Sequence, residues 1–305
     1  MKRVAIIGAG IMGVRICRHF ARHGIPVFLI DPSAEALKKA QEILKGISPT
    51  PQLAQGLQNL PEDWRSTEIV FEVVPENLDL KRRVLADLEA FFDDSTVIAS
   101  NTSGLRTSEL TAGMVHPERF LIAHFFNPAD LIPAVEIVPG AETTESALQQ
   151  VIRLLEDTGK KPARLQADIP GFIANRLQHA LLRECFHLME AGVADAETID
   201  LVTRYSLGVR LALIGPLLQR DLNGLDTHLN IAEYLYPDLS ARQTPFETLS
   251  DKVTSGDLGR KSGQGFYNWN SEQNARMEHI EALLPEVIAL SARTDTATQH
   301  MTNEE

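Results

Sequence analysis

Cysteine, long apolar runs and positive charge are the features that this chain of 305 residues has little of. The two cysteines, Cys17 and Cys185, lie far apart in helix-like segments beside apolar residues, so we expect reduced core thiols and no disulfide framework. No apolar run approaches the ~18 residues that predict a membrane-spanning helix. The 41 acidic residues outnumber the 29 lysines and arginines, and this net charge of −12 argues against nucleic acids and acidic membranes as partners.

Apolar residues, in contrast, are plentiful. They make up 44% of the chain, which is enough for a sizeable core, and the length favours two domains. The first residues, Met1 to Val4, lead directly into an apolar run. We therefore expect no signal peptide and a soluble, cytoplasmic protein.

The first half of the sequence alternates short apolar runs with segments of helical spacing. Runs that are apolar at every residue are typical of parallel strands buried on both faces. Repeated strand–helix–strand units predict an α/β fold with a Rossmann-type, doubly wound, mostly parallel sheet. The expected strands are residues 4–7, 27–30, 69–74, 97–99, 120–124 and 135–138, and the expected helices are residues 11–23, a helix capped by Ser33, and residues 78–91 and 145–157.

The pattern changes near residues 166–171, where Pro170 and Gly171 follow a short polar stretch. From there apolar residues recur at spacings of three and four, which is typical of helices. Further helical patterns cover residues 196–205 and 221–235. We therefore expect a Rossmann domain at residues 1–167, a smaller all-helical domain at 168–270, and a C-terminal helix with a polar tail at 271–305.

A glycine-rich turn follows the first expected strand. Gly8, Gly10 and Gly13 match the spacing G-x-G-x-x-G, which is weak evidence alone but stronger between a strand and a helix. The first glycine allows a tight turn, the second lets the backbone approach a pyrophosphate, and the third lets the helix pack closely on the strand. Amides at the start of the helix, at Ile11 and Met12, and the helix dipole favour the negative charge of a dinucleotide.

Asp31 ends the second expected strand, where an acidic residue of this pattern accepts hydrogen bonds from the adenosine ribose. Its carboxylate would repel a 2′-phosphate, and residues 32–35 contain no arginine to bind one. The expected cofactor is therefore NAD and not NADP. The plainer alternative for Asp31 is a turn residue before Pro32.

His124 and Glu136 lie on two successive expected strands. Oxidation of a hydroxyl to a carbonyl needs a base for the hydroxyl proton, and histidine suits this role because its unperturbed pKa lies near neutrality. Pro128 and Pro133 predict that the intervening segment loops back, so Glu136 could meet His124, fix its tautomer and stabilise the imidazolium. Spacing alone leaves two alternatives open: an ordinary hydrogen-bonded histidine, and a glutamate that faces solvent.

Five motifs follow one another along the chain: Gly8–Gly13, Ser100–Ser103, His124–Pro128, Pro170–Arg176 and Gly259–Tyr267. In this order and spacing the chain resembles the L-3-hydroxyacyl-CoA dehydrogenase family over about residues 2–270. The resemblance implies an NAD-dependent oxidation of a 3-hydroxy group to a 3-keto group. It also implies that His124 and Glu136 form a catalytic dyad and that Ser103 and Asn175 bond the substrate oxygen region.

The same resemblance implies further cofactor contacts. Ser103 and Asn127 match positions that touch the nicotinamide end, and Glu76, Lys81 and Lys261 match other contacts. Composition alone favours a solvated helix face for Lys81 and a basic turn for Lys261. The family's second domain mediates dimerisation, so a homodimer is implied as well, and no metal ion is expected.

The chain departs from the acyl-CoA members of that family after the second strand. Those members typically carry a long helical insertion there, with lysines that hold the CoA nucleotide. Between Gly46 and Leu80 this chain has Arg65 as its one basic residue, and three prolines disfavour a long helix. The lysines that could replace the insertion are Lys38, Lys39 and Lys45.

We expect the substrate to be a short-chain L-3-hydroxyacyl-CoA similar to 3-hydroxybutyryl-CoA. A first alternative is the same chemistry on a small free hydroxy acid such as carnitine or gulonate, whose carboxylate Arg176 or Arg210 could bind. A second alternative is a non-catalytic, structural NAD-binding protein. The intact set of His124, Glu136, Ser103 and Asn175 argues against this last reading.

Overall fold

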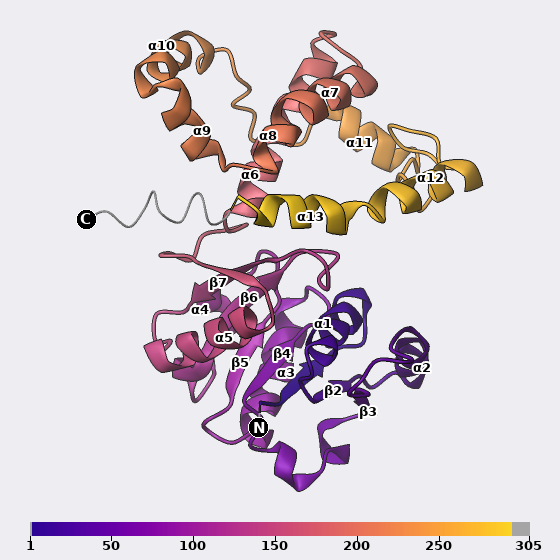
Figure 1. Cartoon of the computed structure of the whole chain (residues 1–305), viewed down its shortest axis with the longest axis vertical. Coiled ribbons are helices and arrows are strands. Elements are labelled where there is room, and N and C mark those ends of the chain that lie inside the picture. The colour runs from indigo at the N-terminus through magenta and orange to yellow at the C-terminus, as the bar shows by residue number, and fades with distance from the viewer. Residues whose placement is uncertain (1, 295–305) are drawn as a thin grey trace. The chain divides into compact units, whose positions relative to one another are not determined.

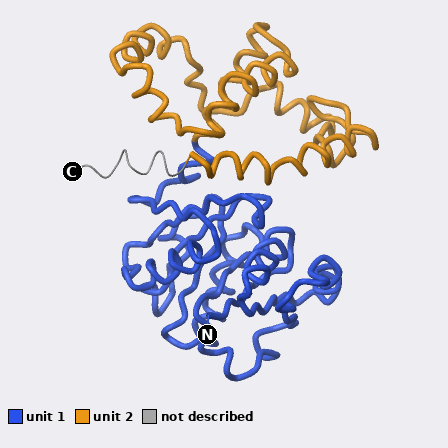
Figure 2. The backbone as a smooth tube through the Cα atoms, viewed as in Figure 1, with its two compact units in different colours: residues 1–176 blue, residues 177–305 orange. Residues whose placement is uncertain are grey.

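The computed structural model describes residues 2–294, and most of the expected polar tail, residues 295–305, lies outside the described residues. The chain divides into two compact units, residues 1–176 and residues 177–305 (Figure 2). The division falls inside one helix, α6 (Ala174–Glu190), a few residues after the boundary expected at residue 167.

The first unit is built on an eight-stranded sheet with the strand order β3-β2-β1-β4-β5-β6-β7-β8 (Figure 1). Neighbouring strands are parallel except for the antiparallel pair β6 and β7, so the doubly wound, mostly parallel α/β sheet is confirmed. The strands are β1 (Val4–Ile7), β2 (Val27–Ile30), β3 (Gln52–Ala54), β4 (Ile69–Glu72), β5 (Val97–Ser100), β6 (Phe120–Phe125), β7 (Ala134–Pro139) and β8 (Lys161–Arg164).

Both faces of the central strands are covered. Alternate residues of β1 point to opposite faces, so Val4 and Ile6 join one apolar core while Ala5 and Ile7 join the other. Every residue of β1, β2, β4 and β5 is buried, as continuous apolar runs predict. The edge strands β3 and β8 were not predicted, because β3 is three residues long and β8 is largely exposed.

Helices of the first unit connect the strands. The Ser33 hydroxyl accepts a hydrogen bond from Ala36 N (3.2 Å), so the predicted cap is confirmed. Asn77 and Thr144 cap two further helices in the same way. The helices are α1 (Ile11–Arg22), α2 (Ala34–Ile43), α3 (Leu78–Phe91), α4 (Thr107–Leu110) and α5 (Glu145–Asp157), with short 3-10 turns η1 (Leu57–Asn59), η2 (Glu62–Trp64) and η3 (Pro117–Arg119).

The second unit is helical, as expected, but two of its helices are broken. The helix expected at 196–205 continues after Val202 as a π-helical segment, and the one expected at 221–235 is interrupted at Gly224, which has φ +88°. A positive φ ends a helix, and glycine adopts it without steric cost. The elements after α6 are α7 (Ala196–Val202), η4 (Thr203–Gly208), α8 (Val209–Leu211), α9 (Pro216–Asn223), α10 (Leu225–Leu235), α11 (Glu247–Thr254), α12 (Ser271–Glu281) and α13 (Leu284–Ala292).

Within residues 2–294, no single helix combines the length and the apolar character needed to cross a membrane. One pair of helices, Ala196–Leu211 with Pro216–Asn223, reaches both limits together by length and composition alone, and it is bent by 87°.

Candidate active site

The glycine-rich turn lies between β1 and α1. Gly8 has φ +111° and donates its amide to Ile30 O (2.7 Å), and a Cβ on Gly13 would lie 1.8 Å from Gly8 O. Both positions therefore require glycine. A Cβ on Gly10 would meet no atom within 4 Å, so the space in front of this residue is open to a ligand.

The start of α1 is equipped to hold an anion. Gly10 provides no side-chain cap, and no acidic residue occurs in the first turn. The first helical hydrogen bond joins Val14 N to Gly10 O (3.0 Å), which leaves the preceding amides, at Ile11, Met12 and Gly13, without a helical partner. These amides and the helix dipole fit a pyrophosphate group.

Asp31 follows β2 and is fixed by the backbone around it. Its Oδ2 accepts a hydrogen bond from Ala9 N (2.8 Å), and its Oδ1 accepts one from Ser33 N (2.8 Å). A carboxylate offers about four lone-pair sites, so acceptor capacity remains for ribose hydroxyls. A cavity of about 560 Å³ is lined by the neighbouring Ile30 and Pro32. Together with the glycine turn, this arrangement fits a dinucleotide without a 2′-phosphate.

His124 and Glu136 meet across the antiparallel pair of strands. The register places His124 of β6 opposite Glu136 of β7, and both side chains are buried, at 6% and 4% exposure. His124 Nδ1 lies 2.8 Å from Glu136 Oε2. Because a carboxylate can only accept, Nδ1 carries the proton and Nε2 is left as the basic nitrogen. The two residues therefore have the geometry of an acid–base pair.

The second oxygen of Glu136 belongs to a different contact. Oε1 accepts hydrogen bonds from the amides of Ile173 (2.8 Å) and Ala174 (2.9 Å), where α6 begins. Burial would raise the pKa of Glu136, but the hydrogen bonds from His124, Ala174 and Ile173 hold it below its usual range. The carboxylate is therefore ionised at neutral pH and can support a charged imidazole.

Phe172 packs against the imidazole of His124. Its side chain is fully buried, and its ring centroid lies 5.6 Å from that of His124, while Phe126 lies 4.7 Å from the imidazole on another side. Phe172 has φ +50°, a left-handed conformation that is rare for a bulky residue and costs about 1–3 kcal/mol. Sequence reasoning named this residue within a motif but gave it no role, because no residue type announces a strained φ.

Ser103 and Asn175 lie in contact, and their expected bonds to the substrate stay predictions. Asn175 Nδ2 donates a hydrogen bond to Ser103 O (2.9 Å). Ser103 N in turn donates to Glu76 Oε1 (3.0 Å), and the Ser103 hydroxyl lies 3.4 Å from the same oxygen. Because Ala174 precedes Asn175 and bonds Glu136, these contacts connect the serine loop to the His124–Glu136 pair.

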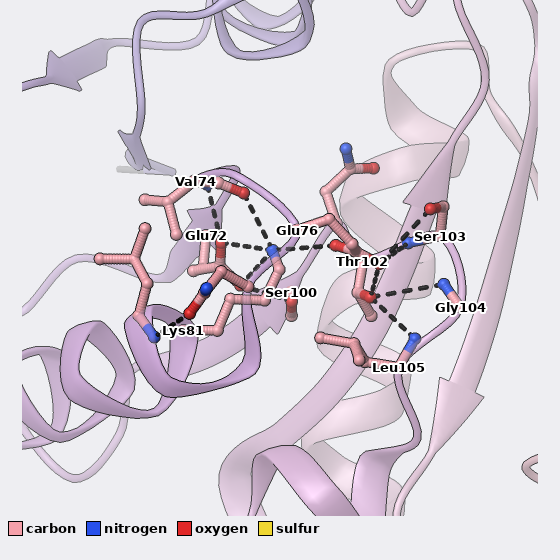
Figure 3. A network of polar contacts seen from close by, with 12 residues as sticks. Glu72, Val74, Glu76, Lys81, Ser100, Thr102, Ser103, Gly104 and Leu105 are labelled. Carbon is pink, nitrogen blue, oxygen red and sulfur yellow. Dashed lines mark hydrogen bonds and ion pairs between the residues drawn. The ribbon is translucent and has the colours of Figure 1, made fainter. Parts of the chain in front are cut away.

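A buried ion pair between Lys81 and Glu72 lies next to Glu76 (Figure 3). Lys81 is fully buried, and its ammonium donates to both oxygens of Glu72 (2.8 and 3.1 Å) and to Val74 O (3.1 Å). Glu76 Oε2 lies 3.6 Å from the same nitrogen. An ammonium has three donors, so Lys81 is satisfied inside the protein. The expected contact of Lys81 with the cofactor stays a prediction. This geometry favours a role in which Lys81 positions Glu76 and does not itself touch the cofactor.

Glu76 connects the ion pair to the loop that starts at Thr102. Its Oε1 accepts from the Thr102 hydroxyl (2.5 Å) as well as from Ser103. Burial would raise the pKa of Glu76, but the Thr102 hydroxyl, the charge of Lys81 and the Ser103 amide hold it below its usual range. Sequence reasoning named Thr102 within a motif but gave it no role, and it gave none to Glu72, although a glutamate inside an apolar run such as residues 69–74 is itself a signal of a paired buried charge.

Two predicted cofactor residues lie outside this network. Asn127 is exposed just after β6, and Lys261 is an exposed residue of the second unit, in the turn where Gly259 pairs with Gln264. Their contacts with the cofactor stay predictions. Residues 2–294 contain no group of three or more His, Cys, Asp or Glu side chains arranged to hold a metal ion.

Two family models cover the chain. Residues 3–169 match the NAD-binding domain of 3-hydroxyacyl-CoA dehydrogenase, and residues 171–269 match the C-terminal domain of the same family. Among relatives, the chain is 31% identical to 5-formyl-3-hydroxy-2-methylpyridine 4-carboxylate 5-dehydrogenase of Mesorhizobium japonicum, over 91% of this chain and 94% of that protein. It is 34% identical to L-carnitine dehydrogenase of Oceanobacillus iheyensis, over 83% and 87%.

Solved structures agree. A structure of 5-formyl-3-hydroxy-2-methylpyridine 4-carboxylic acid 5-dehydrogenase, described as an NAD⁺-dependent dismutase, superimposes with a TM-score of 0.88 and 29% identity over 97% of this chain and 99% of that one. The (S)-3-hydroxybutyryl-CoA dehydrogenase of Ralstonia eutropha gives a TM-score of 0.70 and 30% identity over 89% and 100%. The chain therefore belongs to the 3-hydroxyacyl-CoA dehydrogenase family of NAD-dependent oxidoreductases that act on CH–OH groups.

Proposed function

We propose that this protein oxidises a hydroxyl group of a small, free carboxylic acid to a carbonyl group, with NAD as the oxidant and His124 as the base. The observation that carries the proposal is the buried contact of 2.8 Å between His124 Nδ1 and Glu136 Oε2. A neutral imidazole held in this way presents Nε2 to a hydroxyl proton. An ordinary core histidine would not need an ionised partner that is itself held by two amides.

The residues of the chain divide the work of the reaction. His124 Nε2 takes the hydroxyl proton, and the Glu136 carboxylate stabilises the resulting imidazolium. Ser103 and Asn175 orient the oxygen that becomes the carbonyl oxygen. NAD, when bound, accepts a hydride from the reacting carbon. Cofactor contacts are proposed for the first amides of α1, at Ile11, Met12 and Gly13, and for Asp31, Glu76, Asn127 and Lys261.

A free acid is favoured over an acyl-CoA by the segment after α2. Residues 44–68 hold β3 and two 3-10 turns, and no long helix. Arg65 is the one basic residue in this segment after Gly46. Its guanidinium lies over the Phe91 ring (4.6 Å) and donates a hydrogen bond to Phe91 O (3.2 Å). Lys39 is paired with Glu35 (2.7 Å). CoA carries several phosphate charges, so a chain of net charge −12 offers it little compensation in this region.

A short-chain L-3-hydroxyacyl-CoA is the second candidate. Lys38 and Lys45 line one cavity of about 840 Å³ beside α2. The resemblance to (S)-3-hydroxybutyryl-CoA dehydrogenase also supports a thioester. Glu42 lines the same cavity, however, and reduces its positive charge.

The test is NADH formation, followed by absorbance, with purified protein and a panel of L-3-hydroxybutyryl-CoA, free L-3-hydroxybutyrate, carnitine, gulonate and hydroxylated pyridine carboxylates. We expect turnover of at least one free acid and little of the thioester. The double variant Lys38→Glu, Lys45→Glu should leave the free-acid KM unchanged. Turnover of the thioester alone, with a KM that this variant raises, would replace the free acid by the acyl-CoA.

We also propose that the second unit assembles the protein into a homodimer. The support is its apolar surface: Leu225 and Leu229, four residues apart on one face of α10, are each 62% exposed. Large contiguous apolar surfaces of soluble proteins commonly mark interfaces, and the resemblance to the family implies the same assembly. A mass measured by light scattering that equals one chain at micromolar concentration would contradict a dimer.

A further inference from the structure

The loop of residues 126–133 connects β6 to β7 and contains Asn127. Its Asp130 carboxylate is nearly fully buried, with 1% of the side chain exposed. Arg15 Nη1 donates to Oδ1 (2.8 Å), and Arg18 Nη2 donates to Oδ2. The two arginines lie three residues apart on α1, so they project from the same face of that helix. The Asp130 carboxylate thus accepts hydrogen bonds from two guanidinium groups of α1. The same helix begins beside Gly10, where the space is open.

A third cation bonds the backbone of the same loop. Lys160, which precedes β8 and is 4% exposed, donates to Ala129 O (2.6 Å) and to Ile132 O (2.7 Å). Burial lowers the pKa of Lys160 to about 8, although Asp130 opposes this shift. Two cations therefore bond the Asp130 carboxylate, and a third bonds the backbone of the same loop. Arg15 and Arg18 also line one cavity together with Gly10 and Ile11, at the proposed pyrophosphate site.

We infer that Asp130, Arg15 and Arg18 are positioning residues that fix the spacing between the two ends of the cofactor site. This inference rests on the proposed function. α1 holds the pyrophosphate through its first amides, while the loop carries Asn127, assigned to the nicotinamide end. The buried carboxylate locks the loop against the helix, so the nicotinamide finds its contact already in place. Fixing a reacting group in advance in this way affects affinity and rate without any contact of its own.

The experiment compares two ligands that share one half. ADP-ribose contains the adenosine and the pyrophosphate, whereas NAD adds the nicotinamide. Calorimetric titration gives both Kd values for the wild type and for Asp130→Asn, which keeps the shape of the side chain and removes its charge. We expect the ratio of the NAD Kd to the ADP-ribose Kd to rise about tenfold in the variant, because only the nicotinamide end loses its fixed partner.

A matched control is Asp63→Asn, which disrupts the exposed Arg3–Asp63 pair (2.6 Å) elsewhere in the first unit and should leave the ratio unchanged. Should Asp130→Asn not fold, Arg15→Gln is read in the same way, because this partly exposed side chain supplies one of the two guanidinium bonds. A ratio equal to that of the wild type in a folded variant overturns the inference. A wild-type protein that binds neither ligand overturns the proposed function, and the inference with it.

Discussion

The two units of this chain differ greatly in how many of their side chains are buried. In the first unit the strands β1, β2, β4, β5 and β6 are buried at every residue, and α1, α3 and α5 each place several side chains in the core. In the second unit α7, α10, α11, α12 and α13 have no buried residue, and α9 has only Gln219. The first unit therefore completes its own core, while the apolar side chains of the second lack one within a single described chain.

This difference separates chemistry from assembly. The contacts of the candidate site run through residues 72–175: the Glu72–Lys81 pair, Glu76, the Ser103 loop, Asn175 and the His124–Glu136 pair. None of these contacts needs a residue after 176. Substitutions in the first unit should therefore alter turnover or stability, and those in the apolar surface of α10 should alter the mass of the assembled particle. Four predictions test that separation, from the largest expected effect to the smallest.

Replacement of the base should have the largest effect. His124→Ala removes the group that takes the hydroxyl proton, so we expect kcat to fall about a thousandfold while the mass of the particle stays the same. The matched control is His116→Ala, because His116 also contacts a glutamate, Glu118 (3.0 Å), but is partly exposed. Near-normal turnover of a folded His124→Ala protein would remove His124 from the mechanism.

Breaking the buried pair of Lys81 and Glu72 should cause a large loss of stability in the first unit. Lys81→Met leaves the Glu72 carboxylate buried without its cation, and we expect a loss of about 3–5 kcal/mol in the free energy of unfolding, measured with urea. The double variant Glu72→Gln, Lys81→Met should recover part of this loss. Lys39→Met, at an exposed ion pair, should change stability by less than about 0.5 kcal/mol. Equal losses in Lys81→Met and Lys39→Met would contradict the assigned geometry.

A charge on the second unit should change assembly and not chemistry. Leu229→Glu places a carboxylate in the apolar surface of α10, and we expect the dimer dissociation constant to rise about tenfold or more. Val115→Glu is the control, since Val115 is 75% exposed and belongs to the first unit. Sedimentation at several concentrations distinguishes the two, and a Leu229→Glu variant with the mass of the wild type would count against the proposed interface.

The smallest effect is a dependence of stability on acid. The pKa values of Glu76, Asp130 and Glu136 are all held below their usual range, despite burial, by hydrogen bonds and neighbouring cations. The unfolded chain then binds protons at a higher pH than the folded one, so this stabilisation is complete above the ordinary carboxyl range and is lost as the pH falls through the folded values. Urea midpoints should begin to fall below about pH 6.5, because burial lowers the pKa of His19 to about 3 and only the unfolded chain takes up that proton, and they should fall further below about pH 4 as these carboxylates are protonated. Glu136→Gln should show a shallower fall, and an identical slope would contradict the role given to this carboxylate.

Much of the first unit could be predicted because its signals are local. A continuous apolar run marks a strand buried on both faces, and the strands predicted at 4–7 and 27–30 have those bounds in the structure. Two strands and a returning loop allowed His124 to meet Glu136 but left a solvent-facing glutamate open. In the structure the two residues lie opposite each other in the antiparallel register. Their catalytic role stays a prediction.

What could not be predicted depends on contacts distant in sequence. Nothing near Lys81 indicates that its ammonium is buried with Glu72, because the two residues lie on different elements, α3 and β4. Asp130 likewise reads as a loop residue until α1 brings Arg15 and Arg18 to it. The break at Gly224 was missed for a different reason: apolar spacing continues across it, and only the backbone conformation shows where the helix ends.

The carboxylate of Glu136 has one further consequence. One of its oxygens accepts a hydrogen bond from the imidazole of His124. The other accepts hydrogen bonds from the amides of Ile173 and Ala174, at the start of α6, the helix that continues into the second unit. The positive end of a helix dipole therefore helps to keep negative the group that steadies the base. If the first turn of α6 were drawn away, Glu136 would lose two donors at once and the imidazole would lose its fixed partner. A single side chain thus couples the start of α6 to the protonation chemistry of the first unit.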